Sequence, residues 1–273
     1  MTDRYAVIGN PIGHTKSPLI HGMFARATGQ DMLYSALLGP TEHFVETAQA
    51  FRLGGGLGMN VTAPFKMDAF RWATGHSERA KLAGAVNALK FEDDHILAEN
   101  FDGVGLVRDV VHNLGQPLRG KRVLVLGAGG AARGALLPFL AEQPALLVLA
   151  NRTVGKAQAL AKEVSAHGKV HACGLGDLGG QRFDVVFNAT SASLSGELPA
   201  VAASVFGDDA LAYELAYGKG LTPFLRLARN AGIKRLADGV GMLVEQAAEA
   251  FEWWRGVRPH TREVIDAITV PLT

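Results

Sequence analysis

Short apolar runs alternate with segments of helical periodicity along the chain. The runs are bounded by glycine, asparagine or proline, which is typical of buried strands. The expected strands are YAVIGNP (5–11), GLGMNV (56–61), two short segments within 85–100, KRVLVL (121–126), ALLVLANR (145–152), FDVVFNAT (183–190) and ALAYELAY (210–217). The expected helices are 17–29, 41–56, the start of 77–100, the segment after 127–130, 153–168, 222–232 and 241–256. Repeated strand–helix units predict an α/β protein with parallel, helix-covered sheets, divided near Gly103.

Local signals place the ends of several expected helices. In the segment 17–29, Ser17 is the expected N-cap, Pro18 the first helical residue and Gly29 the stop. Thr153 is the expected cap of the helix that follows the strand at 145–152.

Composition and charge narrow the class of protein. The 273 residues carry a formal net charge of +1, which gives no electrostatic reason to expect nucleic acid or an anionic membrane as a partner. The single cysteine, Cys173, rules out an intrachain disulfide. The N-terminus does not resemble a signal peptide, and no apolar run is long enough to span a bilayer. We therefore expect a cytoplasmic protein.

The segment VLVLGAGGAARG (123–134) predicts a dinucleotide site. A strand precedes the glycines and an alanine-rich helix follows, which is the context that gives such a motif meaning. Gly127 and Gly129 allow a tight turn and a close approach of a pyrophosphate to the helix N-terminus. Ala132 stands at the third glycine position, where a small residue is allowed. A plain strand–helix turn is the alternative.

The end of the next strand indicates which dinucleotide is bound. NAD sites usually have an acidic residue there, whereas this chain has Asn151, Arg152 and Thr153. A guanidinium suits the 2′-phosphate of NADP, and Lys156 adds a second positive charge one turn later. We therefore expect NADP as the cofactor, against the alternative that Arg152 is only a solvated surface base.

Three polar clusters in the first hundred residues provide the candidate chemistry. Their hydroxyls, amides, amine and carboxylate suit a small polyol or hydroxy acid. The clusters are Thr15 with Ser17, Asn60 with Thr62 and Lys66, and Asn87 with Asn100 and Asp102. A lysine whose pKa is tuned by a carboxylate can take the proton of an alcohol during hydride transfer. Taken singly, each of these residues also fits a turn, a cap or a solvated surface position.

Together these motifs resemble the shikimate dehydrogenase family over nearly the whole chain. The matching segments are NPIGHTKSP (10–18), NVTAPFK (60–66), LAGAVNAL (82–89), NFDGVGL (100–106), GAGGAARG (127–134), NRT (151–153), YGKGLTPFL (217–225) and ADGVGMLVEQAAEAF (237–251). The resemblance implies an α/β fold of two domains with a cleft between them. Residues 1–102 plus 240–273 would form the substrate-binding domain, and residues 103–239 the Rossmann-like NADP-binding domain.

The resemblance also implies a role for individual residues in an NADP-dependent alcohol dehydrogenase. Lys66 would be the general acid and base, with Asp102 as its partner. The substrate-binding residues would be Thr15 and Ser17 at the carboxylate, Thr62 and Asn87 at the ring hydroxyls, and also Phe101, Tyr217 and Gln246. The cofactor-binding residues would be Gly127, Ala128, Gly129, Gly130, Ala131, Asn151, Arg152, Thr153, Lys156, Thr190, Leu215 and Gly239, the last beside the nicotinamide. No metal is expected, and the chain would be a monomer or homodimer.

The chain departs from the family pattern at five positions. Thr15 stands where Ser is usual, Ala88 and Phe101 where Thr is usual, Glu214 where Asp is usual and Leu215 where Met is common. If the Phe101 ring faces the pocket, a substrate hydroxyl loses a partner at a cost of about 1–3 kcal/mol. On this hypothesis shikimate still reacts but binds weakly, and Phe101→Thr lowers KM.

Two alternative functions remain open. A paralogue acting on quinate or an aminoshikimate-type compound would keep the same catalytic pair. A non-catalytic NADP-binding regulatory module would keep the fold, but Lys66 and Asp102 are both retained, which disfavours it.

Overall fold

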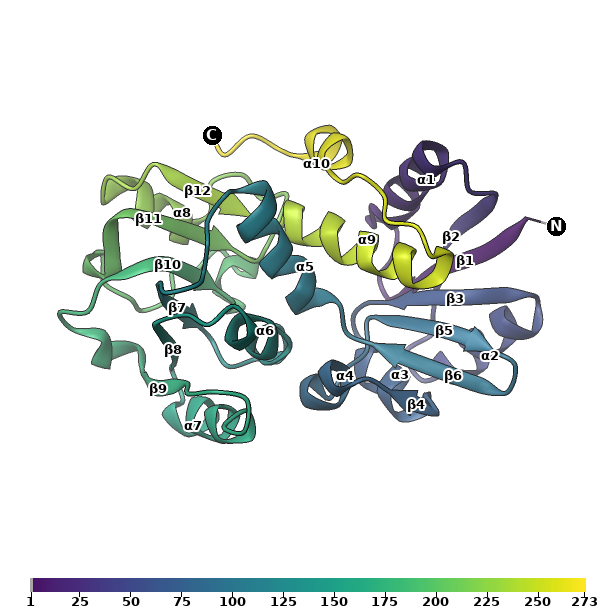
Figure 1. Cartoon of the computed structure of the whole chain (residues 1–273), viewed down its shortest axis with the longest axis horizontal. Coiled ribbons are helices and arrows are strands. Elements are labelled where there is room, and N and C mark those ends of the chain that lie inside the picture. The colour runs from purple at the N-terminus through teal and green to yellow at the C-terminus, as the bar shows by residue number, and fades with distance from the viewer. Residues whose placement is uncertain (1) are drawn as a thin grey trace. The chain divides into compact units, whose positions relative to one another are not determined.

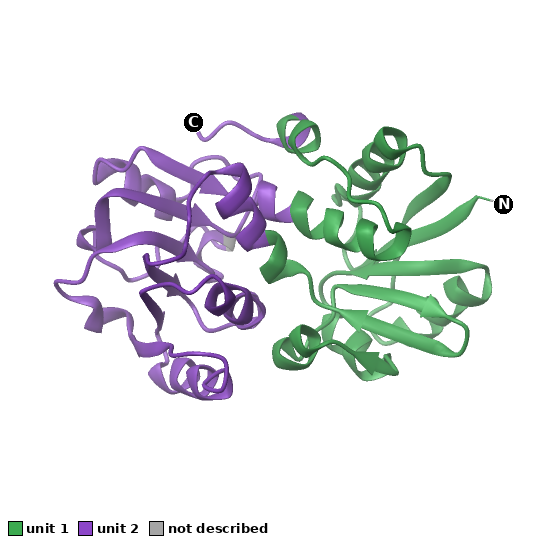
Figure 2. Ribbon diagram, in the orientation of Figure 1, with its two compact units in different colours: residues 1–105, 244–266 green, residues 106–243, 267–273 purple. Residues whose placement is uncertain are grey.

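A computed structural model describes residues 2–273 of the chain, which divide into two compact units. Unit 1 contains the described residues up to Gly105 together with Val244–Asp266, and unit 2 contains Leu106–Leu243 and Ala267–Thr273 (Figure 2). Within residues 2–273, no helix combines the length and apolar character that crossing a membrane requires.

Unit 1 is built on a six-stranded sheet in the order β2-β1-β3-β5-β6-β4 (Figure 1). Its strands are β1 (Asp3–Gly9), β2 (Met32–Leu38), β3 (Gly56–Val61), β4 (Gly75–His76), β5 (Ala88–Glu92) and β6 (His95–Glu99). β1 pairs in parallel with β3, as the alternation predicted, and also with β2, but β5 runs antiparallel to both β3 and β6. The prediction missed β2 and the two-residue β4. The connection between β5 and β6 is only Asp93–Asp94, which is a hairpin turn too short for the crossover that parallel strands need.

The helices of unit 1 are α1 (Ser17–Thr28), α2 (Phe44–Leu53), α3 (Lys66–Trp72), α4 (Glu78–Ala83), the start of α5 (Asp102–Arg108), most of α9 (Val240–Arg255) and most of α10 (Arg262–Ile268). The prediction located α1, α2, α4 and α9, with shifted ends, and it missed the short helices α3, α5 and α10. Gly29 ends α1 with φ of 65°, as expected. The prediction that Ser17 is the N-cap was wrong: Lys16 already has helical dihedral angles and occupies the cap position, so Ser17 is the first helical residue.

Unit 2 is an all-parallel sheet in the order β12-β11-β10-β7-β8-β9. Its strands are β7 (Arg122–Leu126), β8 (Leu146–Asn151), β9 (His171–Gly174), β10 (Phe183–Asn188), β11 (Phe206–Glu214) and β12 (Arg235–Asp238). Its α-helices are α6 (Gly130–Ala141), α7 (Val154–Glu163) and α8 (Pro223–Asn230). It also contains the short π-helix η1 (Asp109–Asn113) and the short 3-10 helices η2 (Leu175–Leu178), η3 (Ala192–Leu194) and η4 (Ala203–Val205). The central strands read as continuous apolar runs because the sheet is buried on both faces. The prediction missed the edge strands β9 and β12, which have four residues each.

A buried aromatic group packs α1 against β2 and α9 in unit 1. The His21 ring stacks on Tyr34 with centroids 4.1 Å apart and planes 6° apart, and it also contacts Phe24, Phe251 and Trp254. His21 is fully buried, and neither ring nitrogen has a hydrogen-bond partner among the described residues. Burial lowers the pKa of the His21 imidazole from 6.5 to about 3, so this ring is neutral throughout the ordinary pH range.

We expect His21 to make the fold acid-sensitive. Between pH 6.5 and about 3 the unfolded chain carries a proton on this imidazole that the folded chain does not, so stability falls as pH falls through this window. By pH 4 the effect amounts to about 3 kcal/mol. His21→Phe should therefore lose less stability than the wild type between pH 7 and pH 4 in urea unfolding. The exposed His95→Phe is the control, and an equal loss in all three proteins would contradict the expectation.

Candidate functional site

A lysine and an aspartate meet at the first residues of two short helices in unit 1. Lys66 begins α3 and Asp102 begins α5, and Lys66 Nζ lies 2.5 Å from Asp102 Oδ2. Their side chains are 33% and 18% exposed, so the pair is partly shielded but open to a small molecule. The start of α5 is held by Asn100, whose Oδ1 accepts the Asp102 N–H at 3.1 Å and whose Nδ2 donates to the Ala85 carbonyl. The predicted partnership of Lys66 and Asp102 is present in the geometry.

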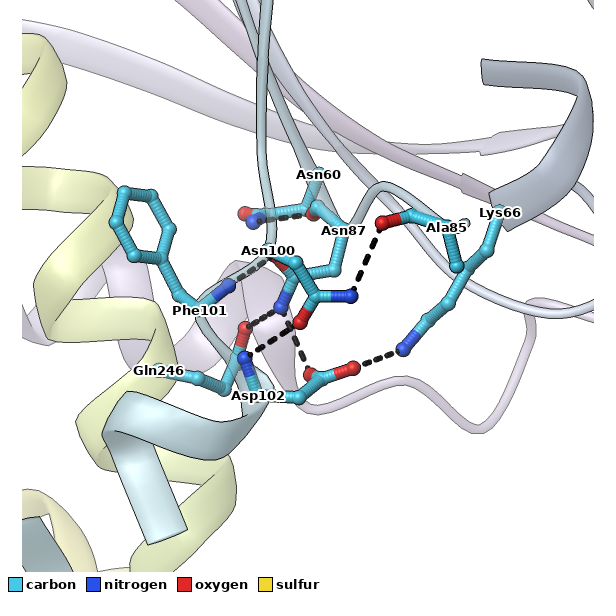
Figure 3. A network of polar contacts seen from close by, with 8 residues as sticks. All are labelled: Asn60, Lys66, Ala85, Asn87, Asn100, Phe101, Asp102 and Gln246. Carbon is cyan, nitrogen blue, oxygen red and sulfur yellow. Dashed lines mark hydrogen bonds and ion pairs between the residues drawn. The ribbon is translucent and has the colours of Figure 1, made fainter. Parts of the chain in front are cut away.

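The amide of Asn87 connects this pair to the late helix α9 (Figure 3). Its Nδ2 donates to Asp102 Oδ1 at 2.8 Å and to Gln246 Oε1 at 3.1 Å. Its Oδ1 accepts the Phe101 N–H at 2.8 Å, which sets the orientation of the amide. Asn87 is only 3% exposed, so these bonds satisfy a group that water does not reach freely. Four of the predicted residues are thereby brought together: Lys66, Asn87, Asp102 and Gln246.

Two further residues, for which the sequence indicated no role, extend this hydrogen-bond network. Tyr34 OH donates to Asn60 Oδ1 at 2.6 Å, and Asn60 Nδ2 donates to the Asn87 carbonyl at 3.1 Å. Burial raises the pKa of the Tyr34 phenol well above its usual value, so it stays a donor. Asn60 was in the predicted inventory but received no role. A tyrosine inside the apolar stretch MLYSALL was the available signal, because a buried phenol needs a partner.

The remaining predicted residues of unit 1 lie at strand and helix ends. Thr15 Oγ1 donates to Ser17 Oγ at 3.2 Å and accepts the Ser17 N–H, so the two hydroxyls sit side by side at the start of α1. Thr62 directly follows β3, and its N–H donates to the Ile8 carbonyl. A Cβ on Gly9 would lie 2.5 Å from Thr62 Cγ2, so this glycine leaves the room that Thr62 occupies. All three threonine and serine side chains are half-buried.

Phe101 does not take the position that the sequence hypothesis required. Its side chain is 4% exposed and points toward α9, away from Lys66 (Figure 3). The ring contacts Trp253 edge-on at 5.7 Å, and the Arg79 guanidinium lies 5.7 Å from its centroid. Phe101 contributes to the polar site only through its backbone N–H, which donates to Asn87 Oδ1. The Phe101 ring therefore does not face a substrate bound beside Lys66, because packing against its neighbours stabilises it on the other side.

This placement reverses the expected effect of Phe101→Thr. Truncating a buried ring should lower the free energy of unfolding by about 3–5 kcal/mol and should not lower KM for shikimate, the substrate that the resemblance implies. Phe91→Thr, which truncates another buried ring of unit 1, is the matched control for destabilisation. Urea unfolding and initial-rate kinetics on both variants test this, and a fall in KM for Phe101→Thr alone would restore the hypothesis that the ring crowds the substrate.

In unit 2, the glycine-rich turn after β7 has the shape of a phosphate cradle. Gly127 has φ of 102°, and a Cβ there would lie 2.9 Å from the Ala189 carbonyl, so no other residue fits without strain. A Cβ on Gly129 or Gly130 would meet nothing within 4 Å, so the backbone at the start of α6 is open. Ala132 is fully buried, which explains why a small residue is needed at the third position. These features fit a pyrophosphate at the helix N-terminus.

The end of β8 lies next to this turn and carries the predicted adenosine-side residues. The Ala128 N–H donates to Asn151 Oδ1 at 3.3 Å, and Asn151 Nδ2 donates to the Thr153 carbonyl. Thr153 occupies the N-cap position of α7, although its side chain makes no capping bond. Arg152 and Lys156 are exposed there. Two cations without an acidic residue between them suit a 2′-phosphate.

The other predicted cofactor residues follow the neighbouring strands of the same sheet. Thr190 lies two residues after β10, Leu215 one residue after β11 and Gly239 one residue after β12. A Cβ on Gly239 would lie 2.2 Å from the Leu215 carbonyl, so the loops after β11 and β12 pack tightly. Tyr217 is in the loop after β11 with 42% of its surface exposed, and partial burial raises the pKa of its phenol.

Family models match three segments of the chain. Residues 7–89 match the shikimate dehydrogenase substrate binding domain, residues 109–195 match shikimate/quinate 5-dehydrogenase, and residues 239–269 match the shikimate 5′-dehydrogenase C-terminal domain.

Individual relatives match over nearly the full length. A shikimate dehydrogenase (NADP(+)) from Nitrosospira multiformis is 57% identical over 97% of this chain and 96% of its own. The crystal structure of an Ael1 enzyme from Pseudomonas putida is 63% identical with a TM-score of 0.97, covering 99% of this chain and 100% of the other. Shikimate 5-dehydrogenase from Thermus thermophilus, solved with NADP(H) and shikimate, is 30% identical with a TM-score of 0.84, covering 97% and 98%.

Proposed function

This chain belongs to the shikimate dehydrogenase family, and on that premise we propose that it interconverts 3-dehydroshikimate and shikimate with NADP as its cofactor. The observation that carries the proposal is the Lys66–Asp102 pair at 2.5 Å, tied through Asn87 to Gln246. An amine and a carboxylate in contact, surrounded by amides and hydroxyls, suit a proton transfer on a small hydroxy acid.

The proposed mechanism assigns the proton to Lys66. NADPH, when bound, supplies the hydride that reduces the ketone. Lys66 donates a proton from Nζ to the oxygen that becomes the hydroxyl and takes it back in the reverse reaction. Asp102 Oδ2 accepts a hydrogen bond from Nζ and holds the amine in place, while Asn87 occupies Asp102 Oδ1 and prevents the carboxylate from turning.

The positions of several polar side chains support substrate-binding roles for them. Thr15 and Ser17 offer adjacent hydroxyls, and the N-terminus of α1 favours the substrate carboxylate there. Thr62, Asn87 and Gln246 would bind ring hydroxyls, and Tyr217 would contribute from the loop after β11. We add Asn60 to this group, because its amide is oriented by Tyr34 and bonded to the Asn87 backbone.

We propose that Thr15, rather than Phe101, weakens substrate binding. The extra methyl of Thr15 occupies space beside the two hydroxyls, which would crowd a carboxylate.

We propose that the two domains have the separate binding roles that the sequence indicated. Residues 1–102 plus 240–273 would bind the substrate, and residues 103–239 would bind NADP. The cofactor-side set would be Gly127 to Ala131 at the pyrophosphate, Asn151, Arg152, Thr153 and Lys156 at the adenosine 2′-phosphate, and Thr190, Leu215 and Gly239 at the nicotinamide. A cytoplasmic monomer or homodimer is proposed.

Initial rates with shikimate and quinate, each with NADP and NAD, test the proposed function. We expect kcat/KM for shikimate with NADP to exceed the other three combinations by about tenfold, since a small mismatch in a binding pocket typically costs about 1–3 kcal/mol. A preference for quinate or for an aminoshikimate-type compound would favour the paralogue. NADP binding without turnover of any of these compounds would favour the regulatory module.

Lys66→Met should separate turnover from binding. Removing the amine should lower kcat by about 100-fold or more, because a general acid–base group contributes roughly 10²–10⁴-fold. Shikimate affinity, measured by calorimetry, should change little by comparison. Lys90→Met, which removes another partly exposed lysine of unit 1, is the control. Near-normal turnover of Lys66→Met would refute the assigned role.

A further inference from the structure

A fully buried carboxylate in unit 2 has no role in the function proposed above. Glu214 is the last residue of β11 and is 0% exposed. Burying a charged carboxylate is costly unless several donors surround it. Burial raises the pKa of the Glu214 carboxyl, while hydrogen bonds from its neighbours act in the opposite direction.

Donors from the end of β10 and from the loops after β10 and β11 converge on this carboxylate. Oε2 accepts from Asn188 Nδ2 at 2.9 Å, from Thr222 Oγ1 at 3.1 Å and from Ser193 Oγ. Oε1 accepts the Ala216 N–H at 3.3 Å. Asn188, Ser193 and Thr222 are themselves at most 5% exposed, so the whole group is shielded from water. Glu214 therefore ties the loop after β10 to the loop after β11.

Asn188 also fixes the position of Thr190 through hydrogen bonds. Asn188 Oδ1 accepts both the N–H and the Oγ1 hydrogen of Thr190, at 3.2 and 2.7 Å. Thr190 in turn lies against the glycine turn, since a Cβ on Gly127 would be 3.1 Å from the Thr190 nitrogen. On the other loop, the Leu215 N–H donates to the Asn188 carbonyl at 3.1 Å. The placement of Thr190 and Leu215 thus depends on bonds that converge on Glu214 and Asn188.

The sheet order indicates which half of the cofactor these loops face. In parallel α/β sheets a dinucleotide lies along the carboxyl ends of the strands, with its pyrophosphate at the first glycine turn. Here that turn follows β7, and the 2′-phosphate residues follow β8 on one side of it. β10 and β11 lie on the other side of β7. Their loops therefore correspond to the nicotinamide half.

We propose that Glu214 is a positioning residue that holds the loops after β10 and β11 in the form that binds the nicotinamide half of NADP. This rests on the proposed function. A glutamine at 214 keeps the shape, but its amide nitrogen has to face either the three donors at Oε2 or the Ala216 N–H. At least one donor then loses its acceptor in a buried site.

Two ligands separate this role from a general loosening of unit 2. NADP carries both halves of the cofactor, whereas adenosine 2′,5′-bisphosphate lacks the nicotinamide. For Glu214→Gln, calorimetry should show about a tenfold rise in Kd for NADP, in line with one lost hydrogen bond to a charged group. Kd for adenosine 2′,5′-bisphosphate should stay within about twofold of wild type.

Four further variants complete the experiment. Glu197→Gln makes the same change at an exposed position of unit 2 and should leave both affinities unchanged. Arg152→Ala should weaken both ligands, because both carry the 2′-phosphate. Glu214→Asp keeps the charge with a shorter reach, so its Kd for NADP should fall between wild type and Glu214→Gln. If Glu214→Gln does not fold, Ser193→Ala removes one donor and should shift Kd in the same selective way.

The outcomes are distinguishable. Equal weakening of both ligands by Glu214→Gln, or no change in either, would overturn the positioning role while leaving the proposed function intact. If the wild type binds neither ligand, the proposed cofactor is wrong and this inference falls with it.

Discussion

The two hydrogen bonds donated by Asn87 Nδ2 are the constraint on which the candidate active site depends. They join Asp102, at the start of α5, to Gln246 in α9, two positions far apart in the sequence. The Phe101 N–H accepted by Asn87 Oδ1 prevents the amide from flipping, so Asp102 always meets a donor on one oxygen and Lys66 on the other. Because Asn87 is buried, breaking any of these bonds leaves an unsatisfied group rather than a hydrated one.

Unit 2 contains a similar buried asparagine with other hydrogen-bond partners. Asn188, at the end of β10, is fully buried and also uses both faces of its amide, donating to Glu214 and Ser193 and accepting from Thr190. In both units a buried asparagine beside a strand orients a carboxylate and a loop. An amide suits this task because it donates and accepts in one rigid plane and carries no charge that burial would penalise.

Apolar packing supports these polar groups from behind. Phe101, Trp254 and Tyr34 belong to one buried cluster of unit 1, and Trp254 Nε1 donates to the Leu89 carbonyl, which fastens α9 to β5. Gln246 lies on the same helix and is thereby held near Asn87. Tyr34 belongs to both systems, since its ring stacks on His21 while its hydroxyl orients Asn60. Packing of the apolar residues thus helps to hold the neighbouring polar residues of the site in position.

The sequence by itself determined the α/β class, most of the strands and the glycine turn, and through the family resemblance it indicated the contact of Lys66 with Asp102. These features depend on local periodicity, on turn residues and on motifs of short span, which one stretch of chain specifies. Only the tertiary structure decided the antiparallel β5, the neighbours of Asn87, the burial of Glu214 and the direction of the Phe101 ring. Each of these depends on residues distant in sequence: the Phe101 ring takes the side where Trp253 and Arg79 offer contact, and nothing in NFDG encodes where those side chains lie.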